Sequence, residues 1–280
     1  MLDLDTWQAQ ALMRLSERFE KDAAVRALVL TGSLADAAIP ADAWSDIDVK
    51  VVLADQAVDT YYASVEWLRD FGRLIGVERH EGRFAKTLRV CLEDFQRFDL
   101  VFVAESALQN PTAWEPGLFQ PPRVVLWSRI PDLEALIATH AYTPVYQDIS
   151  EAELECMVDR FWFKAAIAIS KVVREDLLIG LHLALGLARD CLVLQMIRRD
   201  REKGNNIHRV GGWGNALVTR LSYENHKHTA EAILDLVQQS CEVFDELAML
   251  LSPNYKPRGS LLSTNIEAAR ERVTYYRIKK

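Results

Sequence analysis

Basic residues are the minority among the charged side chains of this sequence of 280 residues. Its 40 acidic residues outnumber 33 basic ones, which gives a formal net charge of −7 at pH 7. A protein that binds nucleic acid usually presents a basic face, so this balance argues against a nucleic-acid partner. It favours a cationic small molecule instead, because an acidic cleft raises the local concentration of cations.

The sequence also lacks signals for export or for a membrane span. Its first residues, MLDLDTWQAQALMRL, contain neither a basic stretch nor a small-residue cleavage site, which argues against a signal peptide. Even the apolar stretch at 177–194 is interrupted by His182, Arg189 and Asp190, so we expect no membrane-spanning helix.

Cysteine and histidine are too scattered to form a disulfide framework or a metal cluster. The four cysteines are far apart and lie in apolar patterns, as expected for the reduced thiols of a cytoplasmic protein. Among the six histidines, the closest pair is His226 and His228, which we expect at a solvated helix start rather than on a metal.

The sequence divides into two halves that differ in the periodicity of their apolar residues. The N-terminal half predicts a small mixed α/β unit, with helices over 5–21 and 56–73 and strands over 25–30, 46–53, 87–92, 97–103 and 124–127. Residues 107–123 hold four of the nine prolines, which predicts a domain junction there and domains at 1–122 and 123–280.

The C-terminal half is helical almost to its end. Ser150 and Glu153 form the pattern of a capping box, and the long helix that they open is followed by helices over 176–200 and 228–251. The predicted fold class is therefore α+β, a mixed sheet followed by a helical bundle.

Three short pieces of the N-terminal half could carry chemistry together. Gly32 and Ser33 lie at the exit of one predicted strand. Asp46 and Asp48 lie at the entrance of the next strand, and Asp99 lies inside a later, otherwise apolar strand. Side chains two apart on a strand point the same way, so Asp46 and Asp48 project together.

Such carboxylates repel each other, and a divalent cation relieves the repulsion. Mg²⁺ typically takes one or two carboxylates plus substrate phosphates. Three carboxylates could hold two metal ions, which would clamp the attacking and leaving oxygens of an in-line displacement. Gly32 would let backbone N–H groups approach a phosphate closely, and the Ser33 hydroxyl could add a hydrogen bond.

Each piece also has a simpler interpretation. A Gly-Ser pair after a strand is common, and Asp46 could cap a turn with Ser45. Asp99 is harder to explain in this way, because a carboxylate on a buried strand is costly without a partner. Arg97 is expected to point to the opposite face of that strand and so to leave Asp99 without one.

In this order and spacing, the pieces resemble the nucleotidyltransferase superfamily that includes DNA polymerase beta and the antibiotic adenylyltransferases. That pattern is a hydrophobic strand, Gly-Ser, a gap, Asp-x-Asp on the next strand and a third acid on a later strand, and it is matched at 28–33, 45–49 and 98–101. Within the superfamily, the chain most resembles the streptomycin-type aminoglycoside 6-adenylyltransferases, with further similar segments at 67–72, 125–127 and 161–178. It departs from them at Leu34, where that family often has arginine, and in the loop at 104–122.

The resemblance implies a catalytic nucleotidyltransferase domain over 1–122 and a helical substrate-binding domain over 123–280. It implies that Asp46 and Asp48 hold the Mg²⁺ of an ATP substrate and that Asp99 completes the metal site. Either Asp99 or a carboxylate of the helical domain would take the proton from the acceptor hydroxyl.

The resemblance also implies roles in the helical half. Lys171 is the expected triphosphate contact, on one helix stripe with Arg160 and Lys164. The alternative is a solvated basic stripe that pairs with neighbouring acids such as Glu175. Glu175 and Asp176 could bind the amines of a polycation or act as the base, or one of them could cap the following helix.

The expected function is transfer of AMP from Mg-ATP to a hydroxyl of an aminoglycoside-like small molecule, the chemistry of a cytoplasmic antibiotic-resistance enzyme. Two alternatives stay open. One is the same reaction on a protein or other acceptor, and the other is a nucleotide-binding relic without catalysis. The presence of all three acids makes the relic the weakest of the three.

Overall fold

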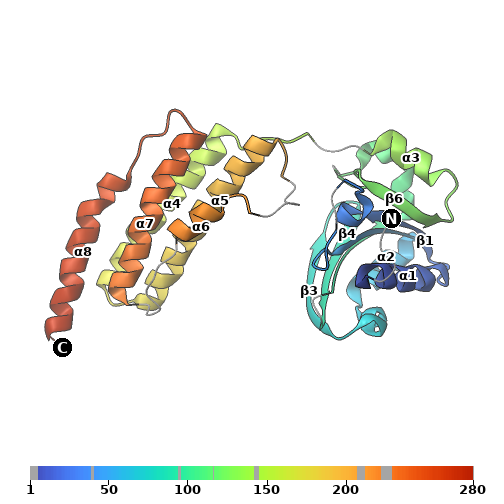
Figure 1. Ribbon diagram of the computed structural model, residues 1–280, viewed down its shortest axis with the longest axis horizontal. Helices are drawn as coiled ribbons and strands as arrows, with labels where there is room; N and C mark the ends of the chain where they lie inside the picture. The colour runs from blue at the N-terminus through green and yellow to red at the C-terminus, as the bar shows by residue number, and fades with distance from the viewer. Residues whose placement is uncertain are drawn as a thin grey trace. The chain divides into compact units, whose positions relative to one another are not determined.

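The computed structural model describes seven segments of the chain: 6–38, 41–93, 96–115, 117–141, 145–206, 212–221 and 229–279. They form two compact units, Met1–Pro144 and Val145–Lys280. The first contains the sheet and the second contains helices, so the fold class is α+β, as predicted (Figure 1).

The first unit is built on a six-stranded sheet in the order β3-β4-β5-β2-β1-β6. Its strands are β1 (Val25–Thr31), β2 (Ile47–Leu53), β3 (Leu74–Glu81), β4 (Ala85–Leu92), β5 (Arg97–Ala104) and β6 (Arg123–Ser128). Neighbouring strands run antiparallel except β2 and β5, which run parallel. The helices of this unit are α1 (Trp7–Glu20), α2 (Val58–Ala63) and α3 (Leu133–His140), with 3₁₀ turns η1 (Gly32–Ala35), η2 (Asp55–Ala57), η3 (Glu66–Phe71), η5 (Glu105–Gln109) and η6 (Pro111–Ala113).

Alternate residues of the central strands enter two different cores. Ile47 and Val49 point to a core that α1, α2 and η3 complete on one face of the sheet. Val52 and Val103 point to a smaller core on the other face, which includes Leu133 of α3. This second face also carries Asp48, because side chains two residues apart on a strand share a face.

The first unit extends beyond the predicted boundary at 122/123. β6 follows that boundary, yet it pairs with β1 as an edge strand of the sheet. The proline-containing segment before it buries Trp114 and Phe119 in the core of the second face. These long-range contacts keep the chain in the first unit as far as Pro144.

Two further differences have local causes. The helix predicted over 56–73 is interrupted at Ser64, whose backbone is extended and whose hydroxyl accepts a hydrogen bond of 3.3 Å from the Glu66 N–H. β3 was not predicted, because it is an exposed edge strand in which Val77 alone is partly buried, so its sequence shows no alternation.

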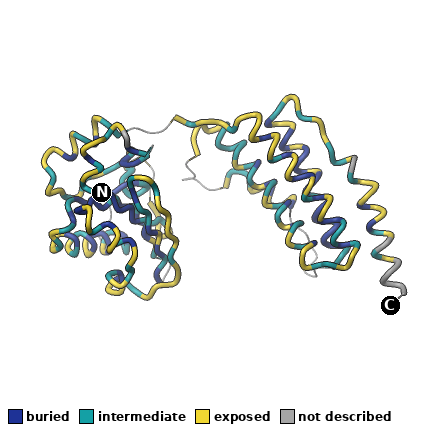
Figure 2. Tube along the Cα trace, turned by 180° about the vertical axis from the view of Figure 1, so that it is seen from behind, coloured by how far each residue is buried: buried dark blue, intermediate teal, exposed yellow. Residues whose placement is uncertain are grey.

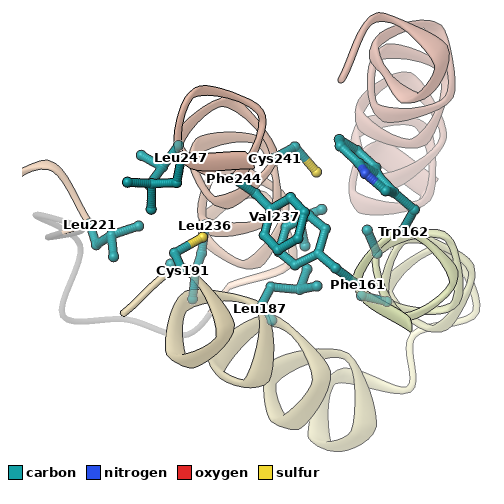
Figure 3. Packing of buried hydrophobic residues seen from close by; sticks show 14 of the residues in the cluster. Phe161, Trp162, Leu187, Cys191, Leu221, Leu236, Val237, Cys241, Phe244 and Leu247 are labelled. Carbon is teal, nitrogen blue, oxygen red and sulfur yellow. The ribbon is translucent and has the colours of Figure 1, made fainter. Parts of the chain in front are cut away.

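The second unit contains the helices α4 (Glu151–Val173), α5 (Leu177–Lys203), α6 (Asn215–Arg220), α7 (Ala230–Leu251) and α8 (Gly259–Lys279). The predicted capping box opens α4: the Ser150 hydroxyl accepts from the Glu153 N–H, and the Glu153 carboxylate accepts from the Ser150 N–H. α7 packs against α4, α5 and α8 and is buried along much of its length (Figure 2). Phe161 of α4 stacks on Phe244 of α7 with ring centroids 3.7 Å apart (Figure 3).

α5 contains the longest apolar stretch considered in the sequence. By length and composition it is apolar enough to cross a membrane, although none was expected. It also contributes Ala184, Leu187, Cys191 and Leu194 to the helical core. A core helix passes the same test, so this one helix is not an indication of a membrane protein.

Candidate functional site

Two of the three predicted acids are direct neighbours in the sheet. β2 and β5 run parallel in a register that pairs Asp48 with Asp99. On the other side of β2, the register pairs Asp48 with Thr31, the last residue of β1. β2 and β5 therefore begin at the edge of the sheet where β1 ends. The carboxylates of Asp48 and Asp99 lie on the same face of the sheet there.

Asp46 precedes β2 by one residue and lies at the same end. One of its carboxylate oxygens is 3.8 Å from a guanidinium nitrogen of Arg97. Asp46 also lies close enough to Asp99 to raise the pKa of that carboxyl. The expectation that Arg97 points away from Asp99 is wrong, because residues two apart on a strand share a face.

Gly32 lies directly against the Asp48 carboxylate. Its backbone is left-handed, with φ of +71°, and a Cβ built on it would lie 2.0 Å from Oδ2 of Asp48. A side chain at this position would therefore overlap the carboxylate. Ser33 follows in the short turn η1, so the predicted Gly-Ser pair lies beside the predicted acids.

Arg89 is a site residue that the sequence did not reveal. It pairs with Asp99 in the antiparallel ladder of β4 and β5, and its Nε is 3.0 Å from Oδ2 of Asp99. Its NH1 is 3.2 Å from Oε2 of Glu78 on β3. The guanidinium thus bridges two carboxylates from neighbouring strands, and these hydrogen bonds raise the pKa of Arg89.

Lys50 is a second residue that was missed. It follows Asp48 by two residues on β2 and is half-buried on the same face. Burial lowers the pKa of Lys50, while Asp48 and Asp99 act in the opposite direction. For Asp99, burial raises the pKa of the carboxyl, and Arg89 and Lys50 oppose that rise.

The charges at this edge of the sheet are therefore close to balance without any bound ion. Three basic side chains, those of Lys50, Arg89 and Arg97, lie near four carboxylates, those of Asp46, Asp48, Glu78 and Asp99. Among the described residues, no group of three or more His, Cys, Asp or Glu side chains is arranged so that it could hold a metal ion. His226 and His228 lie outside the described residues.

A single Mg²⁺ that arrives with a nucleotide still fits this edge. Mg²⁺ needs only one or two carboxylates when phosphate oxygens and water supply its other ligands. Asp46 and Asp48 offer such a pair, and the missing side chain of Gly32 leaves room for the Asp48 carboxylate. The arrangement is thus suited to bind a phosphate chain through a shared cation.

The candidate residues of the helical unit gather at the turn between α4 and α5. Nζ of Lys171 is 3.0 Å from Oδ2 of Asp176, the N-cap residue of α5. Glu175 has φ of +61°, and its N–H donates to the Val172 carbonyl. The Lys171 ammonium lowers the pKa of Asp176.

The other two cations of the predicted stripe have different partners. Lys164 forms an ion pair with Asp190 of α5. Nε of Arg160 donates to the carbonyl of Cys156 on its own helix. Within the stripe, Lys171 is thus the cation paired with another candidate residue.

Comparison with known proteins identifies one family. A family model described as streptomycin adenylyltransferase matches residues 8–255. No curated protein matches the chain.

Two solved structures are similar at low identity. An aminoglycoside 6-adenyltransferase from Bacillus subtilis is 11% identical, with a TM-score of 0.37 over 91% of this chain and 95% of that chain. A nucleotidyltransferase-like protein from Exiguobacterium sibiricum 255-15 is 11% identical, with a TM-score of 0.29 over 93% of this chain and 88% of that chain.

Proposed function

The chain belongs to the streptomycin adenylyltransferase family, and from this premise we propose that it moves AMP from Mg-ATP to a hydroxyl of an aminoglycoside-like small molecule. The observation that carries the proposal is the register pair of Asp48 and Asp99 beside Gly32. Two carboxylates on one face, next to a backbone with no side chain, suit a phosphate chain and its cation.

In this proposal, Asp46 and Asp48 hold the cation that accompanies the nucleotide, and Asp99 completes the site. Gly32 offers its backbone N–H at close range to the phosphates, and Ser33 offers its hydroxyl. When bound, Mg²⁺ supplies positive charge to the phosphate oxygens as the negative charge on them develops. Lys171 is proposed as a further contact of the triphosphate, since an ammonium binds phosphate through charge-assisted bonds.

The reaction forms one bond and breaks one bond. The acceptor oxygen bonds to the α-phosphorus of ATP, the bond from that phosphorus to the bridging oxygen breaks, and pyrophosphate leaves. The hydroxyl proton passes to a carboxylate, for which Asp99 and the turn residues Glu175 and Asp176 are the candidates. Burial favours Asp99, because it raises the pKa of that carboxyl and so its readiness to accept a proton.

The acceptor class follows from charge. A chain with a formal net charge of −7 attracts a cationic acceptor and repels a polyanionic one, so we propose a cationic small molecule rather than nucleic acid. Glu175 is exposed at the α4–α5 turn, where a carboxylate can meet an amine of such an acceptor. We also propose a cytoplasmic location, because the four cysteines are free thiols, as is usual in a reducing compartment.

A pyrophosphate-release assay with ATP, Mg²⁺ and a panel of aminoglycosides tests the function. We expect release that depends on one or more of the drugs, and mass spectrometry should find a product heavier by one AMP moiety. If none of the aminoglycosides caused pyrophosphate release, the proposed substrate class would be wrong. A parallel search for AMP-labelled proteins in lysate would then separate a protein acceptor from a chain without turnover.

A further inference from the structure

We propose that the site binds one divalent cation with its nucleotide rather than two, because Arg89 already pairs with Asp99 and Lys50 adds a second positive charge nearby. This inference rests on the proposed function and concerns the same edge of the sheet. It differs from the sequence-based expectation, in which three carboxylates could hold two metal ions. The basic side chains were not part of that expectation.

The contact between Arg89 and Asp99 is the first support. The two residues are register partners on β4 and β5, so the backbone ladder fixes their separation. Nε of Arg89 lies 3.0 Å from Oδ2 of Asp99, and NH1 of the same guanidinium lies 3.2 Å from Oε2 of Glu78. A metal ion bound through Oδ2 of Asp99 would have to displace this guanidinium, and one bound through the other oxygen would share the carboxylate with it.

Lys50 adds a positive charge from the neighbouring strand. It lies on the same face of β2 as Asp48 and interacts electrostatically with both Asp48 and Asp99. Its stem is half-buried within the sheet face. A second divalent cation at Asp99 would therefore meet two cationic side chains, and like charges at short range repel more strongly in a partly buried site.

Asp46 is held less firmly than Asp99. Its basic partner, Arg97, is 3.8 Å away, compared with 3.0 Å between Arg89 and Asp99, while the two arginines are similarly exposed, at 50% and 54%. An exposed ion pair at that distance contributes little and is readily exchanged for another cation. Asp46 can thus exchange Arg97 for a cation that Asp48 would share, while Asp99 keeps its contact with Arg89.

The test is a count of bound metal on the full chain. Mn²⁺ is titrated in the presence of α,β-methylene-ATP, in which a methylene group replaces the oxygen between the α- and β-phosphorus, so that this linkage cannot be cleaved. Free Mn²⁺ is followed by electron paramagnetic resonance, and bound nucleotide by equilibrium dialysis. We expect one Mn²⁺ per bound nucleotide in the wild type, and a second one in Arg89→Ala and in Lys50→Met.

Lys86→Met is the matched control. Lys86 lies on β4 like Arg89, but on the opposite face of the sheet, where its ammonium is 2.8 Å from Asp59. The Lys86→Met variant loses the same charge as Lys50→Met, and it should still bind one Mn²⁺ per nucleotide. Arg89→Lys keeps a cation beside Asp99 and should also stay at one, which makes it the milder variant if Arg89→Ala does not fold.

The outcomes separate this inference from the proposed function. Two Mn²⁺ per nucleotide in the wild type would overturn the inference and leave the function intact. One Mn²⁺ in the wild type and in both charge-removing variants would overturn the assignment to Lys50 and Arg89. Failure of the wild type to bind the analogue at all would overturn the proposed function, and the inference with it.

Discussion

The carboxylate of Asp48 occupies the space that any side chain at Gly32 would need. A Cβ on Gly32 would lie 2.0 Å from Oδ2 and 2.8 Å from Cγ of Asp48. The glycine is also left-handed, with φ of +71°. The end of β1 and the start of β2 are thus fitted to each other at the atoms on which the proposed chemistry depends.

Gly32→Ala should therefore damage activity more than stability. The new methyl group would push the Asp48 carboxylate aside, and a misplacement of about 1 Å can reduce turnover by roughly 100-fold. The left-handed backbone adds a cost of about 1–2 kcal/mol to the free energy of unfolding. Steady-state pyrophosphate release and urea unfolding measure the two effects separately.

Gly76→Ala is the control for Gly32→Ala. Gly76 lies on the exposed strand β3, and no atom lies within 4 Å of a Cβ built on it. This variant should keep both its turnover and its unfolding midpoint. Equal losses in the two variants would mean that the contact between Gly32 and Asp48 has no special role.

Lys171→Met tests the proposed triphosphate contact. Loss of one charge-assisted bond to phosphate should raise the KM for ATP about tenfold, equivalent to about 1.4 kcal/mol, with a smaller change in kcat. Lys164→Met is the control on the same helix, since Lys164 pairs with Asp190 rather than with a candidate residue. A change in unfolding free energy with an unchanged KM would assign Lys171 a structural role in its pair with Asp176.

The acid pair was predictable from sequence, whereas its partner Arg89 was not. Asp48 and Asp99 interrupt apolar strand patterns, and a charged residue in such a pattern is visible without a structure. Arg89 becomes a site residue only through the register of β4 against β5, which no local pattern encodes. Lys50 could have been found, because its spacing of two from Asp48 puts both side chains on one face.

The C-terminal limit of the first unit could not be predicted from the sequence for a similar reason. β6 is a short edge strand that alternates between partly buried and exposed residues, and its partner β1 is far away in the sequence. The prolines at 107–123 suggested a linker, but Trp114 and Phe119 of this region are buried. Turn-forming residues indicate where the chain bends, and long-range packing decides whether a bend is also a boundary.

Tyr61→Phe should lower stability in a manner that depends on pH. The Tyr61 hydroxyl donates to Asp22, and this hydrogen bond is the main reason why the pKa of the Asp22 carboxyl lies below its ordinary value. A depressed acid pKa stabilises the fold above the unfolded-state pKa, and this stabilisation is lost as pH falls through the folded-state pKa.

At pH 7 the wild type should exceed Tyr61→Phe by about 1 kcal/mol in unfolding free energy. Urea unfolding from pH 7 down to pH 3 should show this difference shrinking as the Asp22 carboxylate becomes protonated. Tyr62→Phe is the neighbouring control, since Tyr62 donates no side-chain hydrogen bond within the described part of the chain and its hydroxyl should have a smaller, pH-independent effect. A difference for Tyr61→Phe that stays constant with pH would contradict the role of Asp22.

Asp245→Ala should be among the most destabilising changes in the helical unit. This buried carboxylate of α7 accepts hydrogen bonds from the Tyr255 hydroxyl and from the backbone N–H groups of Arg258, at 2.9 Å, and Gly259, at 2.7 Å, where α8 begins. Its removal would leave three partly buried donors without this partner, so the free energy of unfolding should fall by about 2–4 kcal/mol. Asp235→Ala removes an acid from the same helix that is 45% exposed and paired with Arg270, and it should cost less than about 1 kcal/mol. Chemical denaturation of both variants measures the contrast, and equal losses would show that Asp245 does not hold the start of α8 to α7.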